Sequence, residues 1–96
     1  MIEVRETDEF RKWMRGLRDT VAKAKIASRI RRLAFGNPGD VKPVGQGVSE
    51  MRIDHGPGYR VYFVGRGETL IVILCGGDKS TQQADIDRAI ALAGEL

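Results

Sequence analysis

Four polar residues alternate along two short segments in the middle of the chain, and their types suit the binding of a phosphodiester. Both segments are predicted β-strands, in which successive side chains point to opposite faces. Glu50 and Arg52 therefore share one face of the first strand, and Arg60 and Tyr62 share one face of the second. If the two strands pair as a hairpin, all four side chains lie on one surface, opposite the predicted core.

Two more charged residues, Asp78 and Lys79, follow the apolar segment 70–75, whose end places them at the rim of that surface. Guanidinium groups bind phosphate oxygens with paired hydrogen bonds, and cations stabilise the charge that develops during phosphodiester cleavage. RNA supplies its own nucleophile, the 2′-hydroxyl, so such a cluster can act without a metal. We therefore predict catalytic roles for Arg60, Arg52, Lys79, Asp78 and Tyr62, with the Tyr62 ring orienting and stacking on a base.

A structural interpretation of the same residues stays open. Glu50 and Arg52 also fit an ordinary exposed ion pair, which contributes about 0–1 kcal/mol. Any half-exposed antiparallel sheet has a polar outer face. Asp78 fits the start of the turn that leads into the next helix slightly better than it fits a catalytic role, and His55 lies in a turn whose polarity explains it better than catalysis does.

The charge of the chain is unevenly distributed. The 96 residues carry a net charge of +3, and they are enough for one domain, which we expect to span 1–96. Residues 1–35 hold ten Lys and Arg against five Asp and Glu, whereas residues 36–96 hold six against eight. Such a basic half suits RNA, DNA, an acidic protein or mere solubility. Arg29 and Arg32, on a predicted basic helix face, are candidates for RNA contact, although a solvated face is the alternative.

The composition argues against several other classes. One cysteine and one histidine cannot form a zinc site, and no intramolecular disulfide can form. The longest apolar run, 70–75, is too short to cross a bilayer. We therefore expect a cytoplasmic protein without a signal peptide, a membrane partner, a metal or a cofactor.

Periodicity and capping signals predict an α+β domain with the order βααβββα and an antiparallel sheet. The two N-terminal helices cover one face of this sheet, and a third helix ends the chain. Thr7 is a predicted helix N-cap, Gly16 is expected to end or bend that helix, and Ser80 begins a capping box. The expected elements are a strand over 2–6, a helix from 8 to 16, a helix from 19 to about 34, a loop over 36–47, strands over 48–53, 59–65 and 69–75, and a helix over 81–93.

Two stretches carry a resemblance to a known family. The segment from Gly47 to Phe63, with Gly-Pro-Gly-Tyr-Arg-Val-Tyr-Phe at its end, and the segment Cys75-Gly-Gly-Asp-Lys-Ser-Thr-Gln-Gln83 resemble the addiction-module killer proteins. These proteins are a HigB-like branch of the RelE/ParE toxin superfamily. The resemblance implies a RelE-like fold and a type II toxin that cleaves mRNA in the ribosomal A site without a metal. It also implies a helix-turn-helix antitoxin as partner.

The resemblance extends to individual residues. Arg60 matches an arginine in the middle strand of the RelE-type sheet. Asp78 and Lys79 fall where other members carry C-terminal active-site residues, often His or Tyr, so the general base is not identified. Lys42 lies near another catalytic position of some relatives, and we count Lys42 and Glu50 with Arg29 and Arg32 as RNA-binding candidates.

Two other functions stay open at this point. ParE-like members share the fold but inhibit DNA gyrase and carry out no chemistry. A degenerate member would act only as a binding module for its antitoxin. A pure binder gives no reason for arginine, lysine and phenol groups to converge on one face, which favours the ribonuclease.

Overall fold

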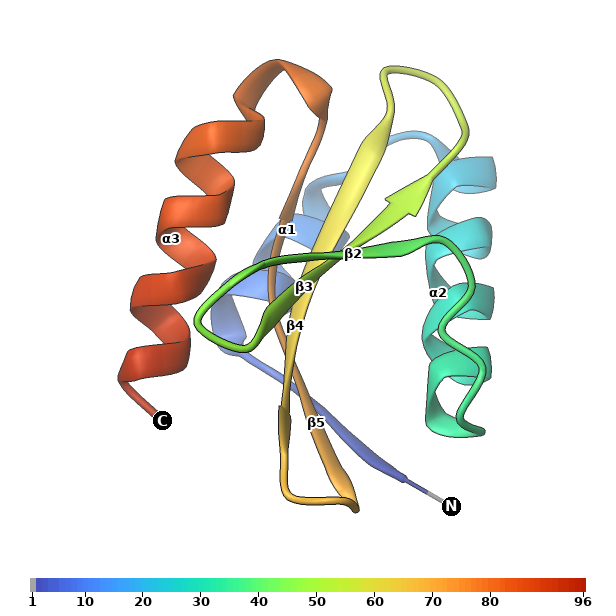
Figure 1. Ribbon diagram of the computed structural model, residues 1–96. Helices are drawn as coiled ribbons and strands as arrows, with labels where there is room; N and C mark the ends of the chain where they lie inside the picture. The colour runs from blue at the N-terminus through green and yellow to red at the C-terminus, as the bar shows by residue number, and fades with distance from the viewer. Residues whose placement is uncertain (1) are drawn as a thin grey trace.

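The computed structural model describes residues 2–96 and confirms the α+β fold class with a RelE-like arrangement (Figure 1). Its elements, in chain order, are β1 (Glu3–Glu6), α1 (Asp8–Gly16), α2 (Thr20–Ala34), β2 (Val41–Gly45), β3 (Val48–Ile53), β4 (Tyr59–Arg66), β5 (Leu70–Gly77), a short 3-10 helix η1 (Lys79–Thr81) and α3 (Gln82–Gly94).

The five strands form one mixed sheet in the order β1-β5-β4-β3-β2. β1 runs parallel to β5, and the other neighbours are antiparallel, so the expected all-antiparallel sheet is corrected. No hairpin joins β1 to β5, because two helices and three strands intervene, and their direction is therefore not constrained to be antiparallel. The apolar strand β5 lies inside the sheet and is covered on both faces, as its composition predicts.

The segment expected to be a loop over 36–47 contains the edge strand β2. Val41 pairs with Met51, and Lys42 pairs with Glu50. Pro43 is compatible with this position because an edge strand has one side free of ladder hydrogen bonds. A two-residue turn joins β2 to β3, and both of its residues, Gln46 and Gly47, have positive φ angles of 55° and 79°. The high glycine and proline content therefore concealed a hairpin.

The N-cap predicted at Thr7 is confirmed, and the helix expected from about residue 19 begins with a cap at Asp19. The Thr7 hydroxyl accepts a hydrogen bond from the Phe10 N–H at 3.0 Å, and the Asp19 carboxylate accepts one from the Ala22 N–H at 3.0 Å. The capping box predicted at Ser80 is wrong. Asp78 instead accepts the Ser80 N–H at 2.8 Å and caps η1, the 3-10 turn that precedes α3.

Helices cover both faces of the sheet, as Figure 1 shows with α3 on one side and α1 and α2 on the other. The residues buried between the sheet and the two N-terminal helices are Phe10, Ile26, Leu33, Met51, Ile53, Val61, Phe63, Ile71 and Ile73. Those buried between the sheet and α3 are Val48, Tyr62, Val64, Val72, Leu74, Cys75, Ala89, Leu92 and Ala93. The face expected to carry an open polar cluster is therefore partly covered by α3.

Two consecutive glycines end β5, and each lets a side chain approach the backbone closely. A Cβ on Gly76 would overlap the Trp13 ring on the α1 face, and one on Gly77 would overlap the Asp85 carboxylate on the α3 face. The Gly-Gly pair of the second motif thus allows helices on both faces to pack against the end of β5.

Candidate functional site

Two arginines lie opposite each other near the end of the β3–β4 hairpin. Arg52 pairs directly with Arg60, and in the adjacent row Glu50 pairs with Tyr62 on β4 and with Lys42 on β2. Directly paired residues on neighbouring strands share a face, so these five side chains, that of Tyr62 included, project from one side of the sheet. The four charged residues among them, together with Lys79, are called the polar cluster below: Lys42, Glu50, Arg52, Arg60 and Lys79.

Glu50 lies at the buried centre of this cluster, with 1% of its surface exposed. Its Oε2 accepts a hydrogen bond from the Tyr62 hydroxyl at 3.0 Å and another from Gln82 Nε2 at 2.8 Å. Gln82 is the first residue of α3, so the carboxylate links this helix to the sheet. A buried carboxylate is costly unless it is paired and hydrogen-bonded, and these contacts offset part of that cost.

Arg60 is the counter-ion of Glu50. Its side chain is 13% exposed, and its Nε lies 3.7 Å from Glu50 Oε1, which is within ion-pair range but too long for a hydrogen bond. One terminal nitrogen donates to the Gly58 carbonyl at 3.2 Å. Within residues 2–96, Glu50 Oε1, Arg60 Nε and Arg52 Nε are buried polar atoms without a hydrogen-bond partner. The ion pair therefore restrains the Arg60 guanidinium while leaving part of its hydrogen-bonding capacity unused.

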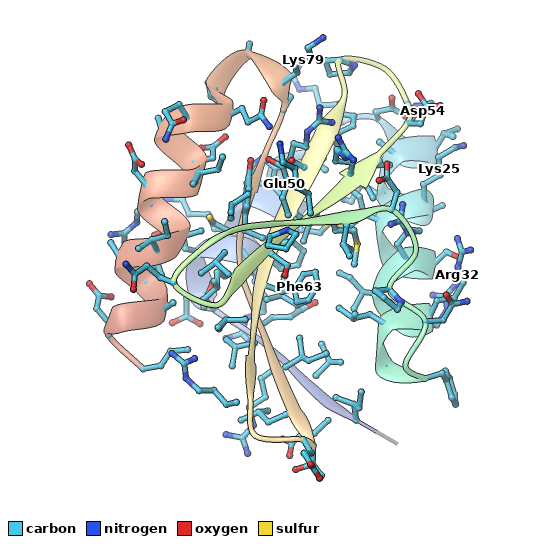
Figure 2. The ribbon with its side chains drawn as sticks, in the orientation of Figure 1. Lys25, Arg32, Glu50, Asp54, Phe63 and Lys79 are labelled. Atoms are coloured by element: carbon cyan, nitrogen blue, oxygen red, sulfur yellow. The ribbon has the colours of Figure 1, made fainter. Side chains whose placement is uncertain are left out.

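The remaining cations of the cluster are more exposed. The Arg52 side chain is 41% exposed and donates to the Asp40 carboxylate at 3.0 Å. Lys42 and Lys79 are exposed. A Cβ on Gly58 would lie 3.4 Å from a terminal nitrogen of Arg60 and 3.5 Å from the Lys79 Cβ, so both side chains border the same turn. Figure 2 shows Lys79 at the end of the sheet where this turn lies, with Glu50 deeper between the strands and α3.

Two sequence expectations for this cluster need correction. Tyr62 is 0% exposed beneath α3, so its ring is not available to stack on a base. Burial, together with the Glu50 carboxylate, raises the pKa of the Tyr62 phenol and keeps it a hydrogen-bond donor. Glu50 is likewise too buried to contact RNA, and it holds Arg60, Tyr62 and Gln82 in place instead.

Two other candidates have structural contacts of their own. The Asp78 carboxylate caps η1, and its hydrogen bonds from the Ser80 hydroxyl and N–H lower its pKa. Arg29 donates to three backbone carbonyls, those of Arg52, Pro38 and Asp40, at 2.7 to 3.2 Å. It thereby fastens the segment after α2 to β3.

Arg32 lies apart from the polar cluster. It lines a groove of about 250 Å³ between α2 and the end of β3, together with Lys25 and Asp54. Figure 2 shows Lys25 and Arg32 on α2, on the other side of the hairpin from α3. The structure therefore does not bring Arg32 into the cluster.

The sequence did not identify three polar residues beside the cluster. The capping-box pattern accounts for Gln82, Asp40 lies in the segment expected to be a loop, and Asp85 is one of two acidic residues in the last helix. The spacing of Gln82, Asp85 and Ile86 along α3, with Ile86 packed against the sheet, was the available signal for a shared inward face. Within residues 2–96, no three His, Cys, Asp or Glu side chains are grouped closely enough to hold a metal ion. None of the helices in this range is long and apolar enough to span a membrane.

Comparisons with known proteins identify the family. Residues 12–96 match the family model described as phage derived protein Gp49-like (DUF891). A Haemophilus influenzae protein, described as an uncharacterized protein, is 52% identical over 95 residues, which cover 99% of this chain and 96% of the relative.

The structural comparison agrees at the level of the fold. The solution structure of the conserved hypothetical protein HP0894 from Helicobacter pylori has a TM-score of 0.53 and 18% sequence identity, and the match covers 83% of this chain and 97% of the other. The chain therefore belongs to the Gp49-like phage-derived family, a toxin-like family related to the RelE/HigB-type addiction modules.

Proposed function

We propose that this protein is the toxin of a type II toxin–antitoxin system and that it cleaves mRNA on the ribosome. The observation that supports the proposal is the direct pairing of Arg52 with Arg60 above a buried carboxylate, with Lys79 bordering the same turn. A bound RNA would place one phosphate between these cations. Lys42, on the neighbouring edge strand, is positioned to hold an adjoining phosphate.

The reaction assigned to this cluster is internal transesterification. The 2′-hydroxyl oxygen attacks phosphorus and releases its proton to water, while the bond to the 5′-oxygen of the next nucleotide breaks and that oxygen takes up a proton. The products are a 2′,3′-cyclic phosphate and a 5′-hydroxyl. The role of Arg60 and Arg52 is to hold the phosphate oxygens and stabilise the charge that develops on them. Lys79 is the group suited to stabilise or protonate the leaving oxygen. Glu50 is a positioning residue because it touches Arg60 and not the exposed surface.

Substitution of Arg60 tests the proposal directly. Arg60→Ala should lower the rate of mRNA cleavage about 10²- to 10³-fold, as the loss of one charge-stabilising donor typically does. The assay is primer extension on mRNA after brief induction of the chain, with cleavage ends compared between variants. Arg18→Ala is the matched control, since Arg18 is exposed and no ion pair of residues 2–96 involves it. An Arg60→Ala chain that stays folded and cleaves like wild type would refute the proposed site.

A second function, inhibition by binding alone, is favoured by one specific observation. Tyr62 is completely buried and the Arg60 side chain is 13% exposed, which limits the contact of both groups with RNA. A ParE-like inhibitor of DNA gyrase would not need that contact. Protein synthesis and the DNA-damage response, measured side by side after induction, separate the two functions: early arrest of translation supports the ribonuclease, and DNA damage with translation intact supports the gyrase inhibitor.

A further inference from the structure

One edge of the sheet has free backbone hydrogen-bonding groups. β1 has a single neighbour, β5, and the N–H groups of Glu3 and Thr7 donate to the Thr69 and Ile73 carbonyls of that side. Backbone groups alternate in direction along a strand, so the N–H and C=O groups of Val4 and Glu6 point away from the sheet. Such an edge can pair with a further strand.

An open groove lies on each side of this edge. The first, of about 550 Å³, lies between β1 and the helices α1 and α2, and its floor includes Val4, Ile30 and Ala34. The second, of about 490 Å³, lies on the face that α3 covers only in part, and Leu70, Val72 and Leu96 line it. A strand added at β1 would therefore find apolar surface for side chains on both of its faces.

One exposed apolar side chain lines the second groove, and another follows the helix residue that lines the first. Leu96, which lines the second groove, is 59% exposed. Phe35 is 76% exposed and directly follows Ala34, which lines the first groove. Burying these two residues against a bound segment would favour association.

The rims of the two grooves are basic. The charged residues that line them are four arginines, Arg5, Arg11, Arg31 and Arg66, and one acid, Glu6. Arg31 and Arg66 form no ion pair with any residue in 2–96. A second copy of the chain would bring the same arginines against one another, whereas an acidic segment would neutralise them.

We propose that the free edge of β1 is the docking site for an extended, acidic segment of the antitoxin. The segment adds a strand to the sheet through the backbone groups of Val4 and Glu6, and its alternate side chains are apolar and enter the two grooves. This inference rests on the proposed function, because it takes the partner to be an antitoxin. The docking surface is nevertheless separate from the polar cluster, since β1 pairs with Leu70–Ile73 whereas Arg60 pairs with Gly77 at the other end of β5.

Amide hydrogen exchange tests the docking mode in the unmodified chain. The probe is the protein encoded beside the gene of this chain, purified and added in excess. In the complex, the amides of Val4 and Glu6 should exchange at least roughly tenfold more slowly than in the free chain, as when an amide enters a hydrogen-bonded ladder. The amides of Glu3 and Thr7 serve as internal controls because they are already bonded to β5. A probe that does not bind, or that binds and leaves Val4 and Glu6 unprotected, overturns the proposal, as does the same protection caused by a second copy of the chain alone.

A matched pair of variants tests the same edge by affinity. Glu6→Pro removes one outward N–H and should weaken binding of the probe roughly tenfold, whereas Glu6→Ala keeps the N–H and should bind like wild type or more tightly. Arg31→Glu should weaken binding more at low salt than at high salt, and Lys12→Glu, an equal charge change outside the grooves, should not. Equal affinity of all four variants would refute the proposal.

The two proposals can fail separately. Glu6→Pro lies far from the polar cluster and should keep the mRNA cleavage of the free chain, while its neutralisation should need roughly tenfold more of the probe. If Arg60→Ala shows that the chain is not a ribonuclease, the exchange pattern at Val4 and Glu6 still decides where the partner binds.

Discussion

Truncation of the buried carboxylate, Glu50→Ala, gives the most direct test of how the polar cluster is held together. The variant removes the acceptor of two hydrogen bonds, from Tyr62 and Gln82, and the counter-ion of Arg60. Gln82 is only partly buried and can turn toward water, so its loss contributes little. The Tyr62 hydroxyl stays buried without a partner, which costs about 1–3 kcal/mol.

The guanidinium adds the larger part of the expected loss. Removing one member of a buried ion pair typically costs about 3–5 kcal/mol. The 3.7 Å separation and the 13% exposure of Arg60 make the lower end of that range appropriate here. We therefore expect Glu50→Ala to lower the free energy of unfolding by about 4–6 kcal/mol in total. A domain of this size is stable by roughly 5–14 kcal/mol, so the substitution removes a large part of the total stability and should shift the urea midpoint strongly downward.

Urea unfolding followed by far-ultraviolet circular dichroism measures this loss. Tyr62→Phe keeps the ring and removes only the hydroxyl, and it should cost about 1–2 kcal/mol, because the bond is to a charged acceptor that Gln82 still contacts. Glu68→Ala, in the exposed β4–β5 turn, is the control and should change stability by less than about 0.5 kcal/mol. A Glu50→Ala midpoint indistinguishable from that of Glu68→Ala would show that the carboxylate does not support the cluster.

Three further perturbations follow from the structure. Gly76→Ala should destabilise the fold by about 1–3 kcal/mol in urea unfolding, because the added methyl overlaps the Trp13 ring, while Gly65→Ala, with open space around it, should not; equal midpoints would contradict the packing. Burial raises the pKa of the Cys75 thiol to about 12, so iodoacetamide at pH 8 should alkylate it only in urea, and rapid native alkylation would argue against this. The hydrogen bond from the Ala22 N–H, followed by that from His55, lowers the pKa of the Asp19 carboxyl, so its ionised form stabilises the fold above the ordinary aspartate pKa of about 3.9 and loses this effect as pH falls through the lowered value. The difference in Tm between wild type and Asp19→Ala should therefore be largest near neutral pH and shrink in acid, and a difference that grows in acid would reverse the assignment.

The sequence predicted those parts of the fold whose signals are local. Thr7 and Asp19 begin helices because a side-chain oxygen reaches an N–H three residues ahead, and that pattern is visible in the sequence. The sequence did not predict β2 because proline and glycine weaken its strand pattern. Its register depends instead on pairing with β3, in which Lys42 lies opposite Glu50. The capping box predicted at Ser80 does not form because the Asp78 carboxylate, two residues earlier, accepts the Ser80 N–H that the Gln83 side chain would accept in such a box.

The candidate site was predictable in its face but not in its depth. A period of two places Glu50, Arg52, Arg60 and Tyr62 together, and the register agrees. Whether such residues are open or covered depends on where α3 packs, which is a tertiary property. The sheet face that we expected to expose Tyr62 is covered by α3, through Gln82 and the apolar side chains that follow it.

The register of β5 constrains how a partner bound at β1 could affect the polar cluster. Glu6 on β1 pairs with Ile73 on β5, and Arg60 on β4 pairs with Gly77, which lies four residues further along β5. With about 3.3 Å per residue along β5 and about 4.8 Å for each of the two strand spacings, Glu6 and Arg60 are roughly 16 Å apart. A segment of four or five residues docked on β1 therefore does not reach Arg60. A partner that stops RNA cleavage from this edge must either continue past α3 to the cluster or be bulky enough to keep the chain from its RNA. A minimal strand peptide should accordingly bind without inhibiting, which makes binding and neutralisation separable properties of the same partner.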